Sequence, residues 1–304
     1  AYLESERPEV LITAKDHGAK VGIAAGMLSR APTRIALGIG NTLGTSETKL
    51  ARRLGVRFLY RFADRIVANS RGVADDLIES FGLPPRKVRV VYNPVVTEQL
   101  LERSREPVPH PWLQPGREFS TVVGCGRLAR QKDFPTLFRA LAEVRRERDC
   151  RLVILGEGPE RDNLQELASE LGIREAVDLP GFVDNSYAHM AKADLFVLSS
   201  RWEGLPNVLI EAMACGAPCV ATDCPSGPRE ILQEGRYGRL VPMGDAPALA
   251  AAMQDSLKSP PSADELREGA ARFRAEAATD NLLEVLGEAV FSPGAPAPDT
   301  PPAE

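Results

Sequence analysis

The sequence contains no run of eighteen apolar residues and shows no signal peptide, so we expect no transmembrane helix. It also has no D-x-D motif, and its three histidines, His17, His110 and His189, do not cluster. Neither divalent-metal dependence nor a Ser-His-Asp or Cys-His nucleophile is therefore indicated. The five cysteines are an odd number, which favours reduced thiols and a cytoplasmic protein. Three of them cluster without the spacing of a zinc site, so buried structural thiols are expected, at Cys215, Cys219 and Cys224.

The 304 residues are enough for two domains, and 43% hydrophobic with 26% charged residues is ordinary for a globular protein. Net charge is uneven: residues 1–115 carry +5 and residues 116–304 carry −10. This asymmetry indicates two domains with different partners. The chain begins with Ala1 rather than methionine, so we expect a fragment or a processed chain.

Short apolar, β-branched segments alternate with segments of helical period, which predicts an α/β fold with parallel sheets. The expected strands are 10–13, 34–37, 65–68, 88–92, 120–123, 151–155, 177–179, 195–198, 218–221 and 239–241. The expected helices are 18–29, 46–62, 71–80, 134–148, 159–171, 206–215 and 247–257. A proline-rich stretch from Arg103 to Glu118 is typical of a linker.

These patterns predict two doubly wound domains. The expected divisions are an N-terminal domain (1–110), a linker (111–118), a second domain (119–260), C-terminal helices (261–291) and a disordered tail (292–304). Ligands of such sheets bind outside the carboxyl ends of the strands. We therefore expect the chemistry in loops that directly follow strands, facing a cleft between the domains.

The loop VVGCGRLARQKDFP follows the strand 120–123 and contains a G-x-G-x-x-A spacing. A dinucleotide fingerprint would start its helix at the glycines. Here Asp133 is the expected N-cap and Pro135 lies in the first turn, so the helix starts later. The loop instead presents Arg127, Arg130 and Lys132, basic residues that suit a diphosphate; a solvated basic loop is the alternative.

Three further loops follow strands. In LGEGPERDNL and in GFV (181–183), the glycines fit either close approach of a flat base or a plain tight turn. In DCPSGPREI, Ser226 and Gly227 either face the same cleft or simply cap the next helix. His17 follows the first strand and would face the cleft, although a lone histidine is usually incidental.

The stretch EGLPNVLIEAMACGAP predicts a buried helix that begins near Pro206 and ends at Gly216. Glu211 lies in its middle, and a buried carboxylate requires hydrogen-bond donors or a charge partner. Its side chain should lean toward the helix N-terminus, where Glu203 lies and where free amides favour anions. We interpret this strand end as a polar ligand site; a structural salt bridge at Glu211 is the alternative.

In this order, the motifs GRLARQKD, LGEGPE, GFV, EGLPNVLIEAMACGAPCVA and SGPREI resemble family 4 glycosyltransferases of the two-Rossmann GT-B fold. The first half is similar through RIVANSRGVADDL and VVYNPV. Compared with that family, an initial βα unit with a glycine-rich loop is absent, so the N-terminal domain is expected to be truncated.

The resemblance implies a retaining transfer of a hexose or N-acetylhexosamine from a nucleotide-diphosphate donor, UDP- or GDP-linked, to a glycan or lipid-linked acceptor. Arg127 and Lys132 match the pair that holds the diphosphate, and Glu211 matches the acid that accepts the ribose hydroxyls. Glu203 and His17 match residues beside the donor sugar. The remaining donor-binding residues implied are Gly158, Val183, Gly204, Pro206, Asn207, Val208 and Leu209. No cofactor, metal or nucleic acid is implied; the alternatives are a non-catalytic nucleotide-sugar-binding module and a sugar-nucleotide epimerase.

A basic ladder recurs every four residues at Lys49, Arg53, Arg57, Arg61 and Arg65. An apolar stripe follows one step along, at Leu50, Leu54, Phe58, Phe62 and Ile66, and is expected to face the core. Like charges at this spacing are mildly unfavourable in a helix. We therefore interpret the ladder as a surface for anionic lipid or an acceptor pyrophosphate, which implies a peripheral position at the inner face of the plasma membrane. A solvated helix face is the alternative.

Overall fold

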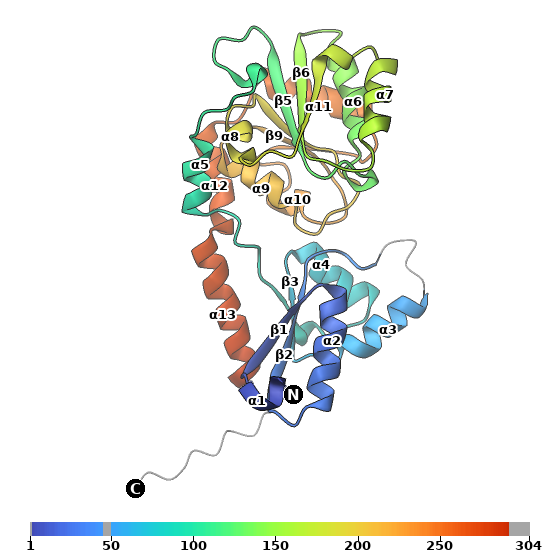
Figure 1. Cartoon of the computed structure of the whole chain (residues 1–304), viewed down its shortest axis with the longest axis vertical. Coiled ribbons are helices and arrows are strands. Elements are labelled where there is room, and N and C mark those ends of the chain that lie inside the picture. The colour runs from blue at the N-terminus through green and yellow to red at the C-terminus, as the bar shows by residue number, and fades with distance from the viewer. Residues whose placement is uncertain (1, 45–49, 292–304) are drawn as a thin grey trace. The chain divides into compact units, whose positions relative to one another are not determined.

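The computed structural model describes residues 2–44 and 50–291, which form two α/β units (Figure 1). The described residues up to Tyr92 and from Ala278 onward form unit 1, and Asn93–Ala277 form unit 2. Each unit contains one parallel sheet, so the predicted α/β fold is confirmed. All ten predicted strands are present, and each end lies within two residues of its predicted position.

Unit 1 is built on a four-stranded sheet in the order β1-β2-β3-β4. Its elements are α1 (Tyr2–Glu6), β1 (Val10–Ala14), α2 (Lys15–Leu28), β2 (Arg34–Ile39), α3 (Leu50–Tyr60), β3 (Arg65–Ala68), α4 (Arg71–Asp75) and β4 (Val88–Val90). Its main core gathers side chains of the central strands and of α2, α3 and α4, including Ile23, Leu37 and Tyr60. The long helix α13 (Ala275–Phe291) packs Val285 against Val67 and Val91.

Unit 2 contains a six-stranded sheet in the order β10-β9-β8-β5-β6-β7. Its strands are β5 (Ser120–Cys125), β6 (Cys150–Leu155), β7 (Val177–Gly181), β8 (Leu195–Leu198), β9 (Cys219–Thr222) and β10 (Arg239–Val241). Its helices are α5 (Glu98–Ser104), α6 (Phe134–Val144), α7 (Arg161–Glu170), α8 (Ser186–Ala191), α9 (Asn207–Ala214), α10 (Pro228–Ile231), α11 (Ala246–Lys258) and α12 (Ala263–Ala270). Helix α6 packs against α7 and α11, whereas α9 packs against α8 and α12.

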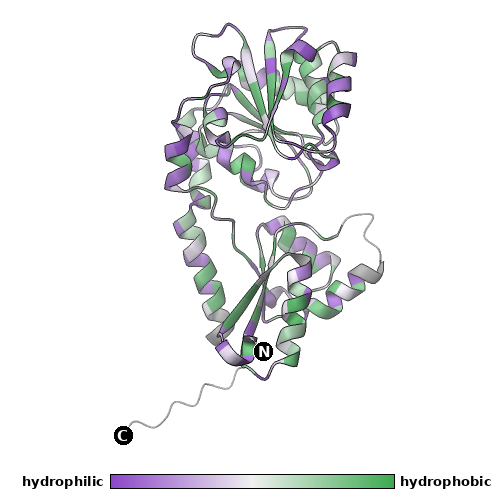
Figure 2. Cartoon of the chain, viewed as in Figure 1, coloured by the Kyte–Doolittle hydropathy of each residue, from purple (hydrophilic) through white to green (hydrophobic). Residues whose placement is uncertain are grey.

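Both sheets are hydrophobic along most of their strands (Figure 2). Strand β8 is fully buried, and so is β9, because helices cover both faces of this doubly wound sheet. Helix α6 begins at Phe134, eight residues after Gly126, with a short 3-10 turn at Arg130–Lys132 between them. This late start confirms that the glycines do not form a dinucleotide fingerprint.

The segment predicted as a linker is not a free connection, and the domain boundary at residue 110 is placed too late. The unit boundary falls at Tyr92, and the following residues belong to unit 2. His110 is buried and its Nε2 lies 2.8 Å from Asp178 Oδ2, while Leu113 is only 2% exposed. Thr121 Oγ1 donates to the carbonyl of Trp112 at 2.6 Å. Proline content alone could not separate a linker from a chain that lies against a surface.

Candidate functional site

The two loops singled out in the sequence both lie at the switch point of the unit 2 sheet. Strand β5 lies between β6 and β8. The chain leaves β5 toward β6 and leaves β8 toward β9, in opposite directions along the sheet. In doubly wound sheets this is the position where ligands bind. The loop after β5 carries Lys132 and the loop after β8 carries Glu203, so the topology brings both predicted residues to one place.

Lys132 and Glu203 form an ion pair, with Lys132 Nζ 2.6 Å from Glu203 Oε1. Ser200 Oγ donates to the same oxygen at 2.7 Å, and Gln131 Nε2 lies 3.4 Å from Oε2. Glu203 is only 6% exposed, so its charge depends on these partners. The sequence predicted both ends of the pair but neither their contact nor the roles of Ser200 and Gln131, which became visible only once β5 and β8 were neighbours.

Backbone hydrogen bonds hold the two loops together around this pair. The amide of Arg201 donates to the carbonyl of Gln131 at 2.8 Å, and Ser199 Oγ donates to the carbonyl of Lys132 at 2.7 Å. Gln131 Nε2 also donates to the carbonyl of Trp202 at 2.8 Å. The position of the Lys132 side chain is therefore coupled to that of the loop that carries Glu203.

Glu211 lies on α9, the buried helix predicted from the sequence. The helix ends as expected at Gly216, whose φ of 82° lets its amide bond Met213 while the amide of Ala217 bonds Ala212. Within residues 2–44 and 50–291, no hydrogen bond or ion pair engages the Glu211 carboxylate. Burial raises its pKa to about 7. The predicted alternative of a structural salt bridge is therefore wrong for this part of the chain.

The charges of Glu211 and Lys132 both influence the pKa of a thiol at the carboxyl end of β5. The thiol of Cys125, at that end, has a pKa raised to about 12, chiefly by burial and further by the Glu211 carboxylate, while Lys132 opposes the shift. Glu211 also contributes, after burial, to a raised pKa of Tyr187 on α8. An unpartnered acid and a lysine thus lie within electrostatic reach of one strand end.

Arg127 is exposed, and the described chain offers its guanidinium no hydrogen bond or ion pair. Lys132 is held over Gly126, because a Cβ at Gly126 would lie 2.8 Å from Lys132 Cε. Gly126 has a φ of 152°, which side chains rarely adopt. The loop can therefore direct one fixed and one free cation toward an anion.

The glycines of LGEGP fit the tight-turn reading. A Cβ at Gly158 would lie 2.3 Å from the carbonyl oxygen of Leu128, and one at Gly156 would lie 2.1 Å from that of Gly126. The amide of Leu128 donates to the carbonyl of Glu157 at 2.9 Å. Both glycines are thus required by the neighbouring loop, and their absent side chains need no ligand to explain them.

The segment SGPREI supports the loop that carries Glu203. Ser226 Oγ donates to the carbonyl of Gly204 at 2.7 Å. Gly227 has a φ of 92°, and a Cβ there would lie 2.4 Å from Pro206 Cδ. Both residues are therefore explained by packing against the EGLP turn, while Pro228 starts the short helix α10.

The other predicted donor-binding residues differ in accessibility. Gly204 and Pro206 are buried, Val208 is partly buried, and Asn207 is exposed and accepts from Asn93 Nδ2 at 2.8 Å. The side chain of Leu209 is 0% exposed, so only its backbone can meet a ligand. Val183 lines a cavity of about 400 Å³ with Ala188, His189 and several prolines.

His17 lies on the first turn of α2 in unit 1 and is exposed. All the other predicted site residues belong to unit 2. The structure of unit 2 therefore assembles Lys132, Glu203 and Glu211 without His17, whose role stays a prediction.

The predicted apolar stripe is not core-facing at Leu54, Phe58 and Phe62, whereas its last member, Ile66 in β3, is buried in the core as predicted. Leu54, Phe58 and Phe62 are 55%, 62% and 43% exposed, whereas Val56 and Tyr60 carry the buried contacts. Arg53, Arg57 and Arg61 are exposed beside them, and Lys49 lies outside the described residues. Arg65 is partly buried in β3, because α3 ends at Tyr60. The surface formed by Leu54, Phe58, Phe62, Arg53, Arg57 and Arg61 is called the α3 patch below.

No helix within the described chain is both long and apolar enough to cross a membrane. Among the same residues, no three His, Cys, Asp or Glu side chains gather as a metal ion would require. Cys215, Cys219 and Cys224 are buried free thiols, as predicted.

Comparison with known proteins gives matches to two glycosyltransferase family models. Residues 120–259 match the family model of Glycosyl transferases group 1, and residues 3–99 match that of Glycosyltransferase Family 4. Two solved structures share the fold: the lipopolysaccharide outer core galactosyltransferase WaaB (TM-score 0.76, 24% identity, 96% of this chain and 77% of that one) and Anabaena HepE in complex with UDP (0.77, 23%, 92% and 79%). The fold is therefore that of the GT-B glycosyltransferases.

The chain belongs to glycosyltransferase family 4. It is 34% identical over 247 residues to the Campylobacter jejuni N-acetylgalactosamine-N,N'-diacetylbacillosaminyl-diphospho-undecaprenol 4-alpha-N-acetylgalactosaminyltransferase, covering 78% of this chain and 64% of that protein. It is 33% identical over 232 residues to the Rhizobium meliloti lipopolysaccharide core biosynthesis glycosyltransferase LpsE, covering 75% and 65%. The chain thus spans less than two thirds of the length of these curated relatives.

Proposed function

We propose that this chain carries the donor site of a retaining glycosyltransferase that moves a hexose or N-acetylhexosamine from a nucleoside diphosphate to a glycan or lipid-linked acceptor. The observation that supports this most strongly is the Lys132–Glu203 ion pair at the switch point of unit 2, with the unpartnered Glu211 at the same strand end. A diphosphate requires cations, and sugar and ribose hydroxyls require acceptors. This site offers both.

In the proposed reaction, the donor diphosphate competes with Glu203 for Lys132 and recruits the free guanidinium of Arg127. Glu203 then accepts hydroxyls of the transferred sugar, and Glu211 accepts those of the ribose. The bond between the sugar C1 and the phosphate oxygen breaks, and its electron pair leaves on that oxygen, stabilised by the two cations. The acceptor hydroxyl attacks from the same face and passes its proton to the leaving phosphate. No cofactor takes part in this scheme.

A panel of nucleotide sugars tests this proposal, with release of nucleoside diphosphate as the readout. UDP-linked donors come first, because the related HepE structure contains UDP; GDP-linked donors follow. Turnover that depends on an added glycan or lipid-linked acceptor supports the transferase. Epimerisation of the donor without an acceptor would indicate the epimerase alternative. Binding without turnover, here and in a longer chain extended at the N-terminus, would indicate a non-catalytic module.

The α3 patch supports a second part of the proposal, which is that unit 1 binds an anionic membrane surface peripherally on the cytoplasmic side. The rings of Phe58 and Phe62 meet edge to face, with their centroids 5.4 Å apart. Both rings are exposed and suited to entering the lipid interface. Each apolar side chain that becomes buried in the lipid contributes up to about 1.5–3 kcal/mol to the free energy of membrane binding. Each arginine near an anionic membrane surface contributes about 1 kcal/mol to the same free energy.

Vesicle flotation tests this surface. We expect wild-type protein to float with vesicles of mixed phosphatidylcholine and phosphatidylglycerol, and much less with phosphatidylcholine alone. Replacing Arg53, Arg57 and Arg61 with glutamine should remove most of the anionic dependence, and replacing Leu54, Phe58 and Phe62 with serine should weaken binding to both. A matched triple variant removes the same charge elsewhere, at Arg130, Arg139 and Arg146, and should float normally. Equal flotation of all variants would contradict the proposal.

A further inference from the structure

Asp133, the residue directly after Lys132, is held in an unusual backbone conformation. Its φ of 46° and ψ of 42° are left-handed, which disfavours residues other than glycine, and it is only 3% exposed. Thr136 Oγ1 donates to Asp133 Oδ2 at 2.9 Å, and the amide of Thr136 donates to the Asp133 carbonyl at 3.0 Å. A buried carboxylate in a strained turn needs a further charge partner to offset its lost hydration.

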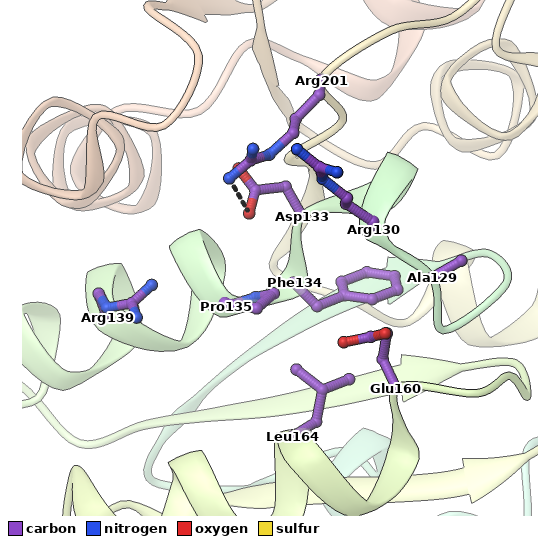
Figure 3. Close-up of a pocket in the computed structure, with 9 residues that line it drawn as sticks. All are labelled: Ala129, Arg130, Asp133, Phe134, Pro135, Arg139, Glu160, Leu164 and Arg201. Atoms are coloured by element: carbon purple, nitrogen blue, oxygen red, sulfur yellow. Dashed lines mark hydrogen bonds and ion pairs between the residues drawn. The ribbon is translucent and has the colours of Figure 1, made fainter.

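That partner is Arg201, on the loop after β8. Arg201 Nε lies 3.1 Å from Asp133 Oδ2, and its terminal nitrogen lies 3.4 Å from Oδ1 (Figure 3). A guanidinium that meets both carboxylate oxygens fixes orientation as well as distance. The ion pair joins the residue that follows Lys132 to the residue two places before Glu203.

Among the described residues, no hydrogen bond or ion pair joins the side chain of Asp133 or Arg201 to Lys132 or Glu203. Their effect passes through the backbone, where the amide of Arg201 also bonds the carbonyl of Gln131. Two ion pairs, Asp133–Arg201 and Lys132–Glu203, therefore join the loop after β5 to the loop after β8. Misplacement of reacting groups by about 1 Å can cost about 10²-fold in rate.

We infer that Asp133 and Arg201 are a positioning pair that sets the separation of Lys132 and Glu203 for sugar transfer. This inference rests on the proposed function. It is distinct from ligand binding at the same place, although Arg201 and Asp133 also line a cavity of about 280 Å³ together with Arg130 and Arg139. If that cavity held an activating anion, neutralising Arg139 would lower activity. The positioning role predicts that it does not.

Steady-state kinetics separates these outcomes, with five variants: D133N, R201Q, R201K, the double variant D133N/R201Q, and R139Q as the control. We expect D133N and R201Q each to lower kcat by about 10–100-fold, with a much smaller change in the donor KM. The double variant should be no worse than either single variant, because one interaction is lost in all three. R201K, which keeps the charge but not the two-point contact, should regain part of the activity. R139Q should match wild type.

A second readout needs no donor. Lys132 is shielded by its ion pair with Glu203, so its amine should react slowly with acetic anhydride relative to exposed Lys192, as measured by mass spectrometry. We expect R201Q to speed modification of Lys132 several-fold relative to Lys192, and R139Q to leave the ratio unchanged. Unchanged labelling, or additive losses of kcat in the double variant, would overturn the inference. Absence of turnover by wild type with every donor would count against the proposed function instead. The labelling of Lys132 would then still test whether Asp133 and Arg201 position the Lys132–Glu203 pair.

Discussion

Replacing Glu211 with glutamine is expected to lower donor turnover by about 10²–10³-fold and to make the ligand-free protein more stable above pH 7. Burial raises the pKa of Glu211 from 4.5 to about 7. Such an acid holds its proton in the folded state at pH values where the unfolded chain has lost it. The free energy of unfolding should therefore fall as pH rises from about 4.5 to about 7, and stay lower above that. The E211Q variant should not show this fall.

The difference in stability has an upper limit of about 3 kcal/mol, since one pKa unit corresponds to about 1.4 kcal/mol. Urea unfolding of both proteins at pH 5 and pH 8 measures it. E170Q, at an exposed position of α7, is the matched control and should behave as wild type at both pH values. An E211Q variant that is less stable than wild type at pH 8 would show that the Glu211 carboxylate has a structural partner.

The same pKa predicts how donor use depends on pH. A carboxyl group with a pKa of about 7 is about one tenth ionised at pH 6 and about nine tenths at pH 8. If the carboxylate accepts the ribose hydroxyls as proposed, kcat/KM for the donor should rise about tenfold over this range. A profile of kcat/KM that is flat between pH 6 and pH 8 would contradict the assignment of Glu211 to the donor.

Replacing Lys132 with methionine is the second prediction with a large effect. Turnover should fall by about 10²–10³-fold, because the leaving diphosphate loses its fixed cation. The variant should also be less stable by up to about 3–5 kcal/mol, because Glu203 stays buried without its ion-pair partner. Ser200 and Gln131 still donate to Glu203, so the lower part of that range is expected.

The double variant K132M/E203Q separates the two effects. It should regain most of the lost stability, because no buried charge is left unpaired, but none of the lost turnover. Exposed Lys192 provides the control, and K192M should match wild type in both denaturant unfolding and nucleotide release. Near-normal turnover of K132M would exclude Lys132 from the diphosphate site.

Much of this site could be predicted because local signals and topology agree. Most strand ends are marked by a glycine, proline or capping residue, although β1 runs directly into α2 at Ala14 with no side-chain cap. Lys132, Glu203 and Glu211 all lie just after strands or on the helix that follows one. Glu211 was recognisable because an acid in an apolar helix is costly without a function. The left-handed turn at Asp133 was not recognisable, because the sequence marks Asp133 only as a helix N-cap.

The two wrong predictions share a cause: neither hydrophobic period nor proline content reveals which distant residues pack against a segment. The stripe at Leu54, Phe58 and Phe62 repeats like a core-facing set, yet Val56 and Tyr60 are the side chains buried in the core. The proline-rich segment after Arg103 has linker composition, yet it packs on unit 2 through His110 and Leu113. Both outcomes depend on tertiary contacts between residues far apart in the sequence.

The central claim is that Lys132, Glu203 and Glu211 form the donor site of a retaining glycosyltransferase. Proton NMR of the product formed from an α-linked nucleotide sugar tests it most directly. The account predicts that the anomeric proton of the transferred sugar keeps the α configuration, and that its signal is lost in K132M and E211Q but not in R139Q. An inverted product, or an unchanged rate of transfer in either site variant, would contradict the account.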